Sequence, residues 1–265
     1  MTGLLSVSLR ALVAAVFNPF FAGELVMVYG SYRRENGRRE AGLLTLRSAA
    51  EGILVGAGML LITAGSGILI KPDPALLFIG PVSWLLSLAD RRFFCFSYGA
   101  VAVITLWQML RRPIDAAGIL TVVGLLHLGE GILVGGSGQR GRVLRFTAEG
   151  GKIKARLWLM RLWPIPLGLL VTAAGGSSGL TMPSWWPLLG PAAGLYRMLP
   201  VAAGVGYEEP IREEKKEKQQ TRRRGRRIAG YGLLLAIAGL GSSRWPLLRE
   251  PALLWMLIGH EFLGK

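Results

Sequence analysis

Long apolar segments separated by short charged runs are the feature that most constrains how this chain folds. Hydrophobic residues make up 51% of the 265 residues, and the mean hydropathy is +0.42. A helix that crosses the hydrocarbon core of a bilayer needs about 20 mostly apolar residues, and it satisfies its own backbone hydrogen bonds. The pattern predicts an all-α, polytopic transmembrane helical bundle that forms a single integral membrane domain over residues 1–265.

Eight or nine spans are expected in this bundle. An N-terminal interfacial helix over residues 1–19 precedes them, and the pair Asn18-Pro19 breaks it. Several candidate spans are shorter than the ~20 residues that an upright crossing requires, so the short ones could be re-entrant. The candidates cover residues 20–33, 48–70, 74–90, 93–110, 116–136, 158–176, 184–206, 227–243 and 250–263.

Basic residues gather between the expected spans and give a net charge of +15. Alternate loops are much richer in Lys and Arg than the loops between them, which predicts a multi-pass plasma membrane protein with a cytoplasmic C-terminus. The charged segment 207–227 is expected to be a cytoplasmic loop, either simply solvated or docking a partner. Anionic lipid headgroups are the expected partners of the basic loops, and nucleic acid is not expected. The residues concerned are Arg140, Arg142, Arg145, Lys152, Lys154, Arg222, Arg223, Arg224, Arg226 and Arg227.

The hexapeptide EGILVG occurs twice, at Glu51–Gly56 and at Glu130–Gly135. Glycines four residues apart lie on one face of a helix and allow another helix to approach closely. The spacing therefore predicts helix contacts at six positions. These are Gly52, Gly56, Gly131, Gly135, Gly190 and Gly194.

The two acids within these apolar segments need partners, because an ionised carboxylate at the bilayer centre costs at least ~2.5 kcal/mol. Arg47 precedes Glu51 by four residues and His127 precedes Glu130 by three, so each pair shares a helix face. Arg161 and Arg197 are candidate partners from other spans. A buried polar cluster is predicted from Arg47, Glu51, His127, Glu130, Arg197, His260 and Glu261.

No catalytic residue, metal ligand set or cofactor site is predicted. The chain has only two histidines, and H-E-x-x-H is absent. A G-x-G-x-x-G match at Gly136, Gly138 and Gly141 follows an expected membrane span instead of a strand, so it carries little weight.

Six stretches, in order along the chain, resemble a known family. They are FNPFF (17–21), RRFFCFSYGA (91–100), LLHLGEGILV (125–134), RLWPIPL (161–167), LPVAAGVGYEE (199–209) and IGHEFLG (258–264). These stretches are similar to the membrane half of Firmicute PDZ-containing membrane proteins, a group that includes MinJ-like cell-division topological determinants. In that family a cytoplasmic peptide-binding PDZ domain follows the spans. This chain ends at Lys265, where such a domain would begin, so a separately encoded PDZ protein is one expected partner and a truncated chain is the alternative.

Together these features predict a non-enzymatic membrane scaffold or anchor that, by resemblance, organises cell-division or envelope proteins. The alternative is a small secondary transporter or channel in which Glu51 and Glu130 line a water-filled cavity. A third interpretation is a membrane-embedded metal-dependent hydrolase, which would require His127 and His260 to reach one metal ion.

Overall fold

The computed structural model describes residues 2–71, 73–90, 93, 95–149, 152–173, 183–190, 195–213 and 215–264. Within these ranges the chain forms eight α-helices, four β-strands and two short 3₁₀ helices. The helices are α1 (Thr2–Val16), α2 (Pro19–Glu35), α3 (Arg38–Ser66), α4 (Ala75–Ser87), α5 (Phe96–Met109), α6 (Ala116–Ser137), α7 (Glu217–Arg244) and α8 (Arg249–Gly264). The strands are β1 (Leu69–Ile70), β2 (Arg142–Glu149), β3 (Lys152–Ala173) and β4 (Leu195–Pro210), and the 3₁₀ helices are η2 (Gly138–Arg140) and η3 (Pro246–Leu248).

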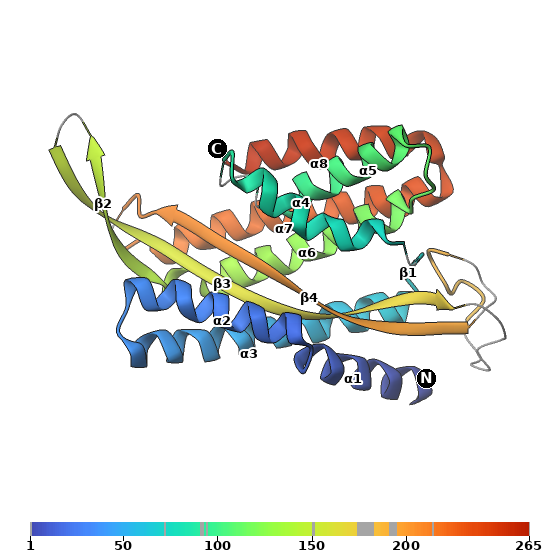
Figure 1. Ribbon diagram of the computed structural model, residues 1–265, viewed down its shortest axis with the longest axis horizontal. Coiled ribbons are helices and arrows are strands. Elements are labelled where there is room, and N and C mark those ends of the chain that lie inside the picture. The colour runs from blue at the N-terminus through green and yellow to red at the C-terminus, as the bar shows by residue number, and fades with distance from the viewer. Residues whose placement is uncertain are drawn as a thin grey trace.

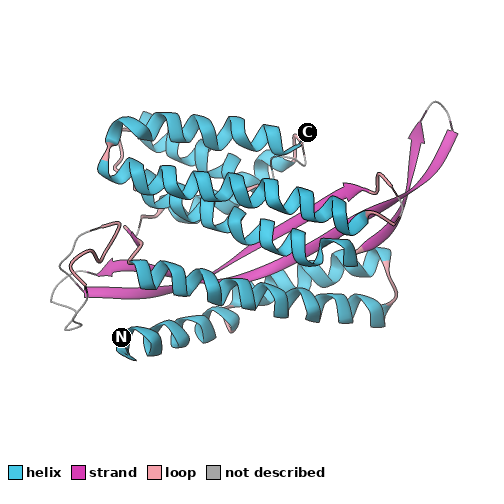
Figure 2. Cartoon of the chain, turned by 180° about the vertical axis from the view of Figure 1, so that it is seen from behind, coloured by secondary structure: helices cyan, strands magenta, loops and turns pink. Residues whose placement is uncertain are grey.

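The sheet runs through the middle of the molecule between two groups of helices (Figures 1 and 2). Helices α1, α2 and α3 lie along one side of the sheet, and the remaining helices form a bundle on the other side. The main core lies between the sheet and this bundle, and its cluster of buried residues includes Trp163 and Ile165 of β3, Leu120 of α6 and Leu235 of α7. All four of these side chains are fully buried.

The long strand β3 organises the sheet. It pairs antiparallel with β2 from Lys152 to Leu159 and antiparallel with β4 from Trp158 to Ala173. The two-residue strand β1 lies parallel to β3 at Leu170 and Val171. Within the described part of the chain, the edge of β3 that faces away from β4 therefore has no strand partner between β2 and β1.

Helix α3 covers this unpaired edge, and two prolines of β3 reduce the number of N–H groups along it. A Cβ atom added to Gly52 would lie 2.0 Å from the Pro164 carbonyl oxygen, and one added to Gly56 would lie 2.1 Å from that of Pro166. Glycines four apart on a helix are spaced by ~6 Å and alternate strand residues by ~6.6 Å, so the two repeats match. Because the N–H and C=O of one strand residue point the same way, both prolines remove a donor that this edge would leave unpaired.

The next residue along the same edge, Leu162, takes its partner from a side chain. Its backbone N–H donates to the Tyr32 hydroxyl oxygen at 2.9 Å, and that hydroxyl also lies 3.0 Å from Ser48 Oγ. An open sheet edge is costly away from water because each unpaired backbone group loses its hydrogen bond. Tyr32, the prolines and the glycines of α3 together remove that cost over the middle of β3.

Helices α6 and α7 pack backbone to backbone through small residues. A Cβ on Gly131 would lie 2.4 Å from the Ala229 nitrogen, and one on Gly124 would lie 2.4 Å from the Ala236 nitrogen. From the opposite helix, Gly232 meets Leu128 in the same way. Such contacts gain dispersion energy without large side chains, as in pairs of membrane helices.

Two of the described helices, α3 and the α6–η2 segment Ala116–Arg140, are long and apolar enough to cross a membrane. The pair Gly3–Val16 and Pro19–Glu35 would give a third span if its 49° bend lies within one crossing. Many large apolar side chains are exposed around the molecule, among them Phe17, Leu54 and Leu77. Exposure of so many large apolar side chains suits a lipid environment better than water.

The expected all-α bundle of eight or nine spans is therefore wrong. The candidate spans 158–176 and 184–206 contain strands β3 and β4, and the apolar helices α4 and α5 have only 13 and 14 residues. The expected loop 207–227 instead contains the end of β4 and the first part of α7. A fully buried strand is as continuously apolar as a membrane helix, which is why hydropathy could not separate them.

Candidate functional site

Basic residues gather at one end of the molecule. The α2–α3 connection, the β2–β3 hairpin and the first turns of α7 all lie at this end, and so does the C-terminus of α8 (Figure 1). The α5–α6 and α7–α8 connections lie at the opposite end. We call the first end the basic end. It carries the larger share of the chain's Arg and Lys residues, including Arg33, Arg34, Arg38, Arg39, Arg142, Arg145, Arg212, Lys215, Lys216, Lys218, Arg222, Arg223, Arg226 and Arg227.

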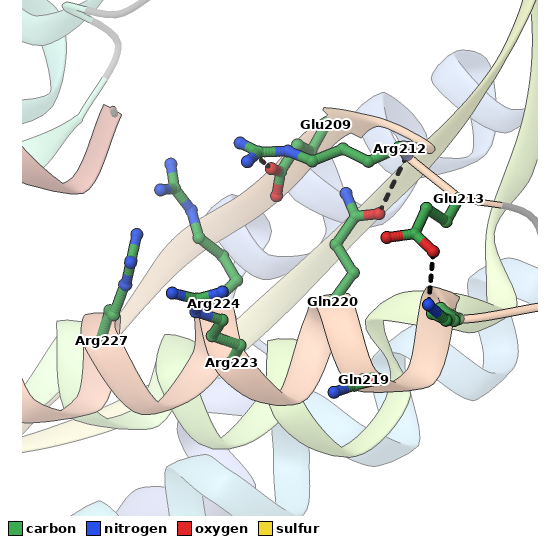
Figure 3. Close-up of a pocket in the computed structure, with 9 residues that line it drawn as sticks. Glu209, Arg212, Glu213, Gln219, Gln220, Arg223, Arg224 and Arg227 are labelled. Atoms are coloured by element: carbon green, nitrogen blue, oxygen red, sulfur yellow. Dashed lines mark hydrogen bonds and ion pairs between the residues drawn. The ribbon is translucent and has the colours of Figure 1, made fainter.

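A groove at the basic end lies between the end of β4 and the start of α7 (Figure 3). Arg212 bridges the two elements, because its guanidinium pairs with Glu209 at 3.0 Å and its backbone N–H donates to Gln220 Oε1 at 3.2 Å. Gln220 also donates to the Pro210 carbonyl at 2.9 Å. Lys216 pairs with Glu213 at 2.5 Å. Acids thus neutralise part of this groove and fix its shape.

A second groove adjoins the first along the same helix, and its described lining contains no acid although it shares Lys216, Gln219, Arg223 and Arg227 with the first. We call it the basic groove. It is lined by Lys215, Lys216, Lys218, Gln219, Arg222, Arg223, Arg226 and Arg227. Apart from Gln219, every lining residue is a cation, and all are exposed. Such a surface attracts anions, and the guanidinium groups can bind phosphate oxygens in bidentate fashion.

Tyr207 of β4 contacts the first groove through Glu209, one of its lining residues. Burial, together with the neighbouring carboxylate of Glu209, raises the pKa of Tyr207 above the ordinary value of 10.0. The hydroxyl therefore stays protonated at neutral pH and donates to Glu209 Oε2 at 2.8 Å. This bond holds the carboxylate that pairs with Arg212.

The other basic residues expected in loops lie on or beside strands, and several are paired. Arg142 on β2 pairs with Glu217 of α7 at 3.0 Å, and Arg145 pairs with Glu208 of β4. Arg140 at the end of η2 lies 3.3 Å from Glu51. Lys152 begins β3, where its backbone is in register with that of Glu149 on β2. Lys154 is exposed on the same strand. Arg222, Arg223, Arg226 and Arg227 of α7 are exposed and form no ion pair within the described part of the chain, and the α2–α3 connection adds further exposed arginines at the same end.

Glu51 lies at the centre of a polar cluster that joins four elements. Its Oε2 accepts hydrogen bonds from Arg161 Nη2 at 2.6 Å, Ser137 Oγ at 2.7 Å and Trp163 Nε1 at 2.8 Å. Arg161 is fully buried, and its guanidinium also lies over the Trp163 ring at 5.3 Å. A carboxylate held by this many protein donors is a structural tie, poorly suited to the ion exchange that a transporter requires.

Other members of the predicted cluster lie elsewhere. Arg47 is exposed on α3, and among the described residues it forms no ion pair with Glu51. Arg197 is exposed on β4 opposite Val171, far along the sheet from Arg161. Glu130 is half-buried in α6, within electrostatic range of His127 and of Arg224 on α7. The two copies of EGILVG therefore have different surroundings.

The histidines meet in the helical bundle with the one cysteine. His127 Nε2 lies 3.2 Å from Cys95 Sγ, and the rings of His127 and His260 are 5.6 Å apart between centroids. Glu261 accepts a hydrogen bond from the Tyr98 hydroxyl at 2.5 Å. Sequence reasoning noted both histidines but missed Cys95, because no spacing rule connects residues so far apart in the chain.

The predicted glycine contacts have different partners. Gly52 and Gly56 face strand β3 instead of a helix, and Gly131 faces α7. Gly135 faces Gly225 of α7, where a Cβ added to Gly225 would lie 2.5 Å from the Gly135 nitrogen. Gly190 has a φ of 108° and faces Leu69, while Gly194 is outside the described residues.

Comparison with known proteins gives one partial match. No protein family model matches the chain, and no solved structure matches it. Over 148 residues the chain is 29% identical to the cell division topological determinant MinJ of Bacillus subtilis (strain 168). The aligned region covers 55% of this chain and 36% of MinJ. The aligned part thus spans about a third of the length of that relative.

Proposed function

We propose that this chain is a membrane protein of the cell-division apparatus and acts as a non-enzymatic scaffold at the plasma membrane. The basic end faces the cytoplasm, and the basic groove binds anionic lipid headgroups. The helices and the buried sheet form the anchor that holds this surface at the membrane.

The change in character along α7 is the single observation that carries the proposal. Its exposed side chains are cationic from Arg222 to Arg227, and from Leu233 to Ile237 they include large apolar groups. Leu233 follows Arg227 by six positions along the helix, a rise of ~9 Å. A polar-to-apolar switch over that distance is expected where a helix passes from headgroups into hydrocarbon, and it supports the proposal.

Cation-rich segments on one side of a membrane protein remain in the cytoplasm. The basic end includes segments that are far apart in sequence, so its charge is a property of the fold and not of one run. This supports a cytoplasmic position for the α2–α3 connection, the start of α7 and the C-terminus of α8. Anionic lipids of the inner leaflet attract each such cation by ~1 kcal/mol.

The division role rests on the relative. The matched protein is named as a cell division topological determinant, and the match covers more than half of this chain. The Glu51 cluster joins helix α3 to the sheet, as a scaffold requires, while the convergence of His127 and His260 within reach of one ion supports a metal-dependent hydrolase as the second candidate. A separately encoded PDZ protein stays a predicted partner on the cytoplasmic side.

The test is the position of a fluorescent fusion in dividing cells. We expect the full chain, expressed in Bacillus subtilis, to fractionate with membranes and to concentrate at division sites. A variant with Arg222, Arg223, Arg226 and Arg227 changed to Gln should remain in the membrane but lose part of this enrichment. Uniform fluorescence of the unaltered fusion around the cell, or recovery in the soluble fraction, would contradict the proposal.

A further inference from the structure

All the cysteine and histidine of this chain lies in one place. The 265 residues include one Cys and two His. Cys95 precedes α5, His127 is in α6 and His260 is in α8, yet one ligand atom from each lies within 4.8 Å of the others. Sulfur and imidazole nitrogen are the ligands that zinc-like ions prefer. Their convergence from three helices is the observation that needs explaining.

The hydrogen bonds of His127 leave one nitrogen for a metal ion. Its Nδ1 lies 2.8 Å from the Val123 carbonyl oxygen, which can only accept, so Nδ1 carries the proton. The lone pair is then on Nε2, the atom 3.2 Å from Cys95 Sγ. A ligating histidine usually donates its second N–H to a carbonyl or carboxylate in this way.

His260 has a similar arrangement through Tyr98. The Tyr98 hydroxyl donates to Glu261 Oε1 at 2.5 Å, so its oxygen can accept from His260 Nδ1 at 3.2 Å. This leaves Nε2 of His260 as its ligand atom. This series of hydrogen bonds, from the Glu261 carboxylate through the Tyr98 hydroxyl to the His260 imidazole, orients the ring. Carboxylates that accept from metal-bound histidines do the same in metalloproteins.

We propose that Cys95, His127 and His260 bind a zinc-class transition metal ion, with the fourth position open to water or another small ligand. A tetrahedral ion with ~2.3 Å bonds to sulfur and ~2.0 Å bonds to nitrogen places its ligand atoms ~3.5 Å apart, close to the observed Sγ to Nε2 distance. On binding, the Sγ–H bond breaks, the proton passes to the solvent, and the sulfur–metal bond forms.

The surroundings fit such a site. Cys95 caps the N-terminus of α5, where its sulfur accepts from the Ser97 backbone N–H at 3.4 Å, and a helix N-terminus favours negative charge. His127 is buried while Cys95 and His260 are half-buried, so the ion has a protected position and a route in. The ion would join α5, α6 and α8. This inference is independent of the proposed division role.

The test uses Co²⁺ as a spectroscopic probe for the full chain, purified in detergent without a histidine tag and stripped with a chelator. We expect one Co²⁺ per chain, a thiolate-to-cobalt charge-transfer band in the near ultraviolet, and competition by Zn²⁺. Cys95→Ser should lose the charge-transfer band. His260→Ala should lower affinity at least tenfold, and Tyr98→Phe should weaken it by 10–100-fold through ring orientation.

Ser97→Ala is the matched control, because Ser97 Oγ also lies 3.4 Å from His127 Nε2 but belongs to no zinc-class ligand set. It should bind Co²⁺ like the unaltered chain. Circular dichroism of each variant checks that it has folded, and Cys95→Ala replaces Cys95→Ser if the latter does not fold. Absence of stoichiometric Co²⁺ binding by the folded, unaltered chain would overturn the proposal. So would full binding by the Cys95→Ala/His260→Ala double variant.

Discussion

Glu51 of α3 and Arg161 of β3 form a buried ion pair with 2.6 Å between Oε2 and Nη2. The Arg161 side chain is fully buried, and that of Glu51 is 20% exposed. Arg161 Nε and Nη1 have no described hydrogen-bond partner. The guanidinium therefore depends on Glu51 for its neutralising charge. This pair ties the helix that covers the open sheet edge to the strand it covers.

Replacing Glu51 with Gln should destabilise the fold by about 3–5 kcal/mol, because it leaves the buried guanidinium without a counter-charge. Thermal or denaturant unfolding of the detergent-purified protein measures this. Arg47→Gln on the same helix is the control and should change stability by less than about 0.5 kcal/mol, since Arg47 is exposed. The double variant Glu51→Gln/Arg161→Met should recover much of the loss. Equal stability of Glu51→Gln and the unaltered chain would show that the pair is not a structural tie.

Gly52→Ala should separate α3 from β3. The added methyl would lie 2.0 Å from the Pro164 carbonyl oxygen, so backbone must move, at a cost of at least about 1–3 kcal/mol. Gly58→Ala is the matched control on α3, where an added Cβ meets nothing within 4 Å. It should stabilise the helix by roughly 0.5–1 kcal/mol. Melting temperatures of the two variants should move in opposite directions, and a shared shift would refute the close contact.

How far the sequence predicted this structure depends on the element. The break at Asn18-Pro19 and the long helices around both copies of EGILVG follow from proline chemistry and apolar length, and the structure has helices there. Strand β3 was missed. Its first half alternates Lys152, Lys154 and Arg156 with apolar residues, a period-two signal for a strand. Its second half is continuously apolar and reads equally well as a membrane helix.

Partners across the fold were the least predictable part of the sites. Arg161 was named as a candidate partner from another span, and the structure pairs it with Glu51. The i, i+4 rule nevertheless placed Arg47 in the predicted cluster, because a local rule cannot weigh it against an arginine more than a hundred residues away. The prolines at 164 and 166 were visible, yet their meaning depends on knowing which strand edge is open. Cys95 joins the histidines only through the packing of α5, α6 and α8.

Neutralising the basic groove should reduce retention of anionic lipid. We expect native mass spectrometry of the detergent-purified chain to show bound phosphatidylglycerol or cardiolipin, with fewer copies in a variant carrying Gln at Arg222, Arg223, Arg226 and Arg227. Added salt should have the same effect by screening. Gln at Arg111, Arg112, Arg244 and Arg249, which lie in or beside the connections at the opposite end, is the control and removes the same four charges. Equal losses in both variants would mean that net charge, and not the groove, holds the lipid.

Alkaline pH should destabilise the fold in part through Tyr207. Its pKa is raised in the folded state above the 10.0 of an ordinary tyrosine, so ionisation favours the unfolded chain. The contribution is complete below pH 10 and is lost as the pH rises above 10. Unfolding measured at several pH values should show a shallower alkaline decline for Tyr207→Phe than for the unaltered chain. Identical slopes would contradict the raised pKa.

The most direct test of the central claim, that the two ends of the molecule lie on opposite sides of the plasma membrane, is labelling of single cysteines in intact cells. In a Cys95→Ser background, Arg226→Cys marks the basic end and Arg112→Cys marks the opposite end, and the parent without added cysteine is the control. With a membrane-impermeant thiol reagent, we predict labelling at 112 in intact cells and at 226 only after the cells are permeabilised. Labelling at 226 in intact cells, or equal labelling at both positions, would contradict the account.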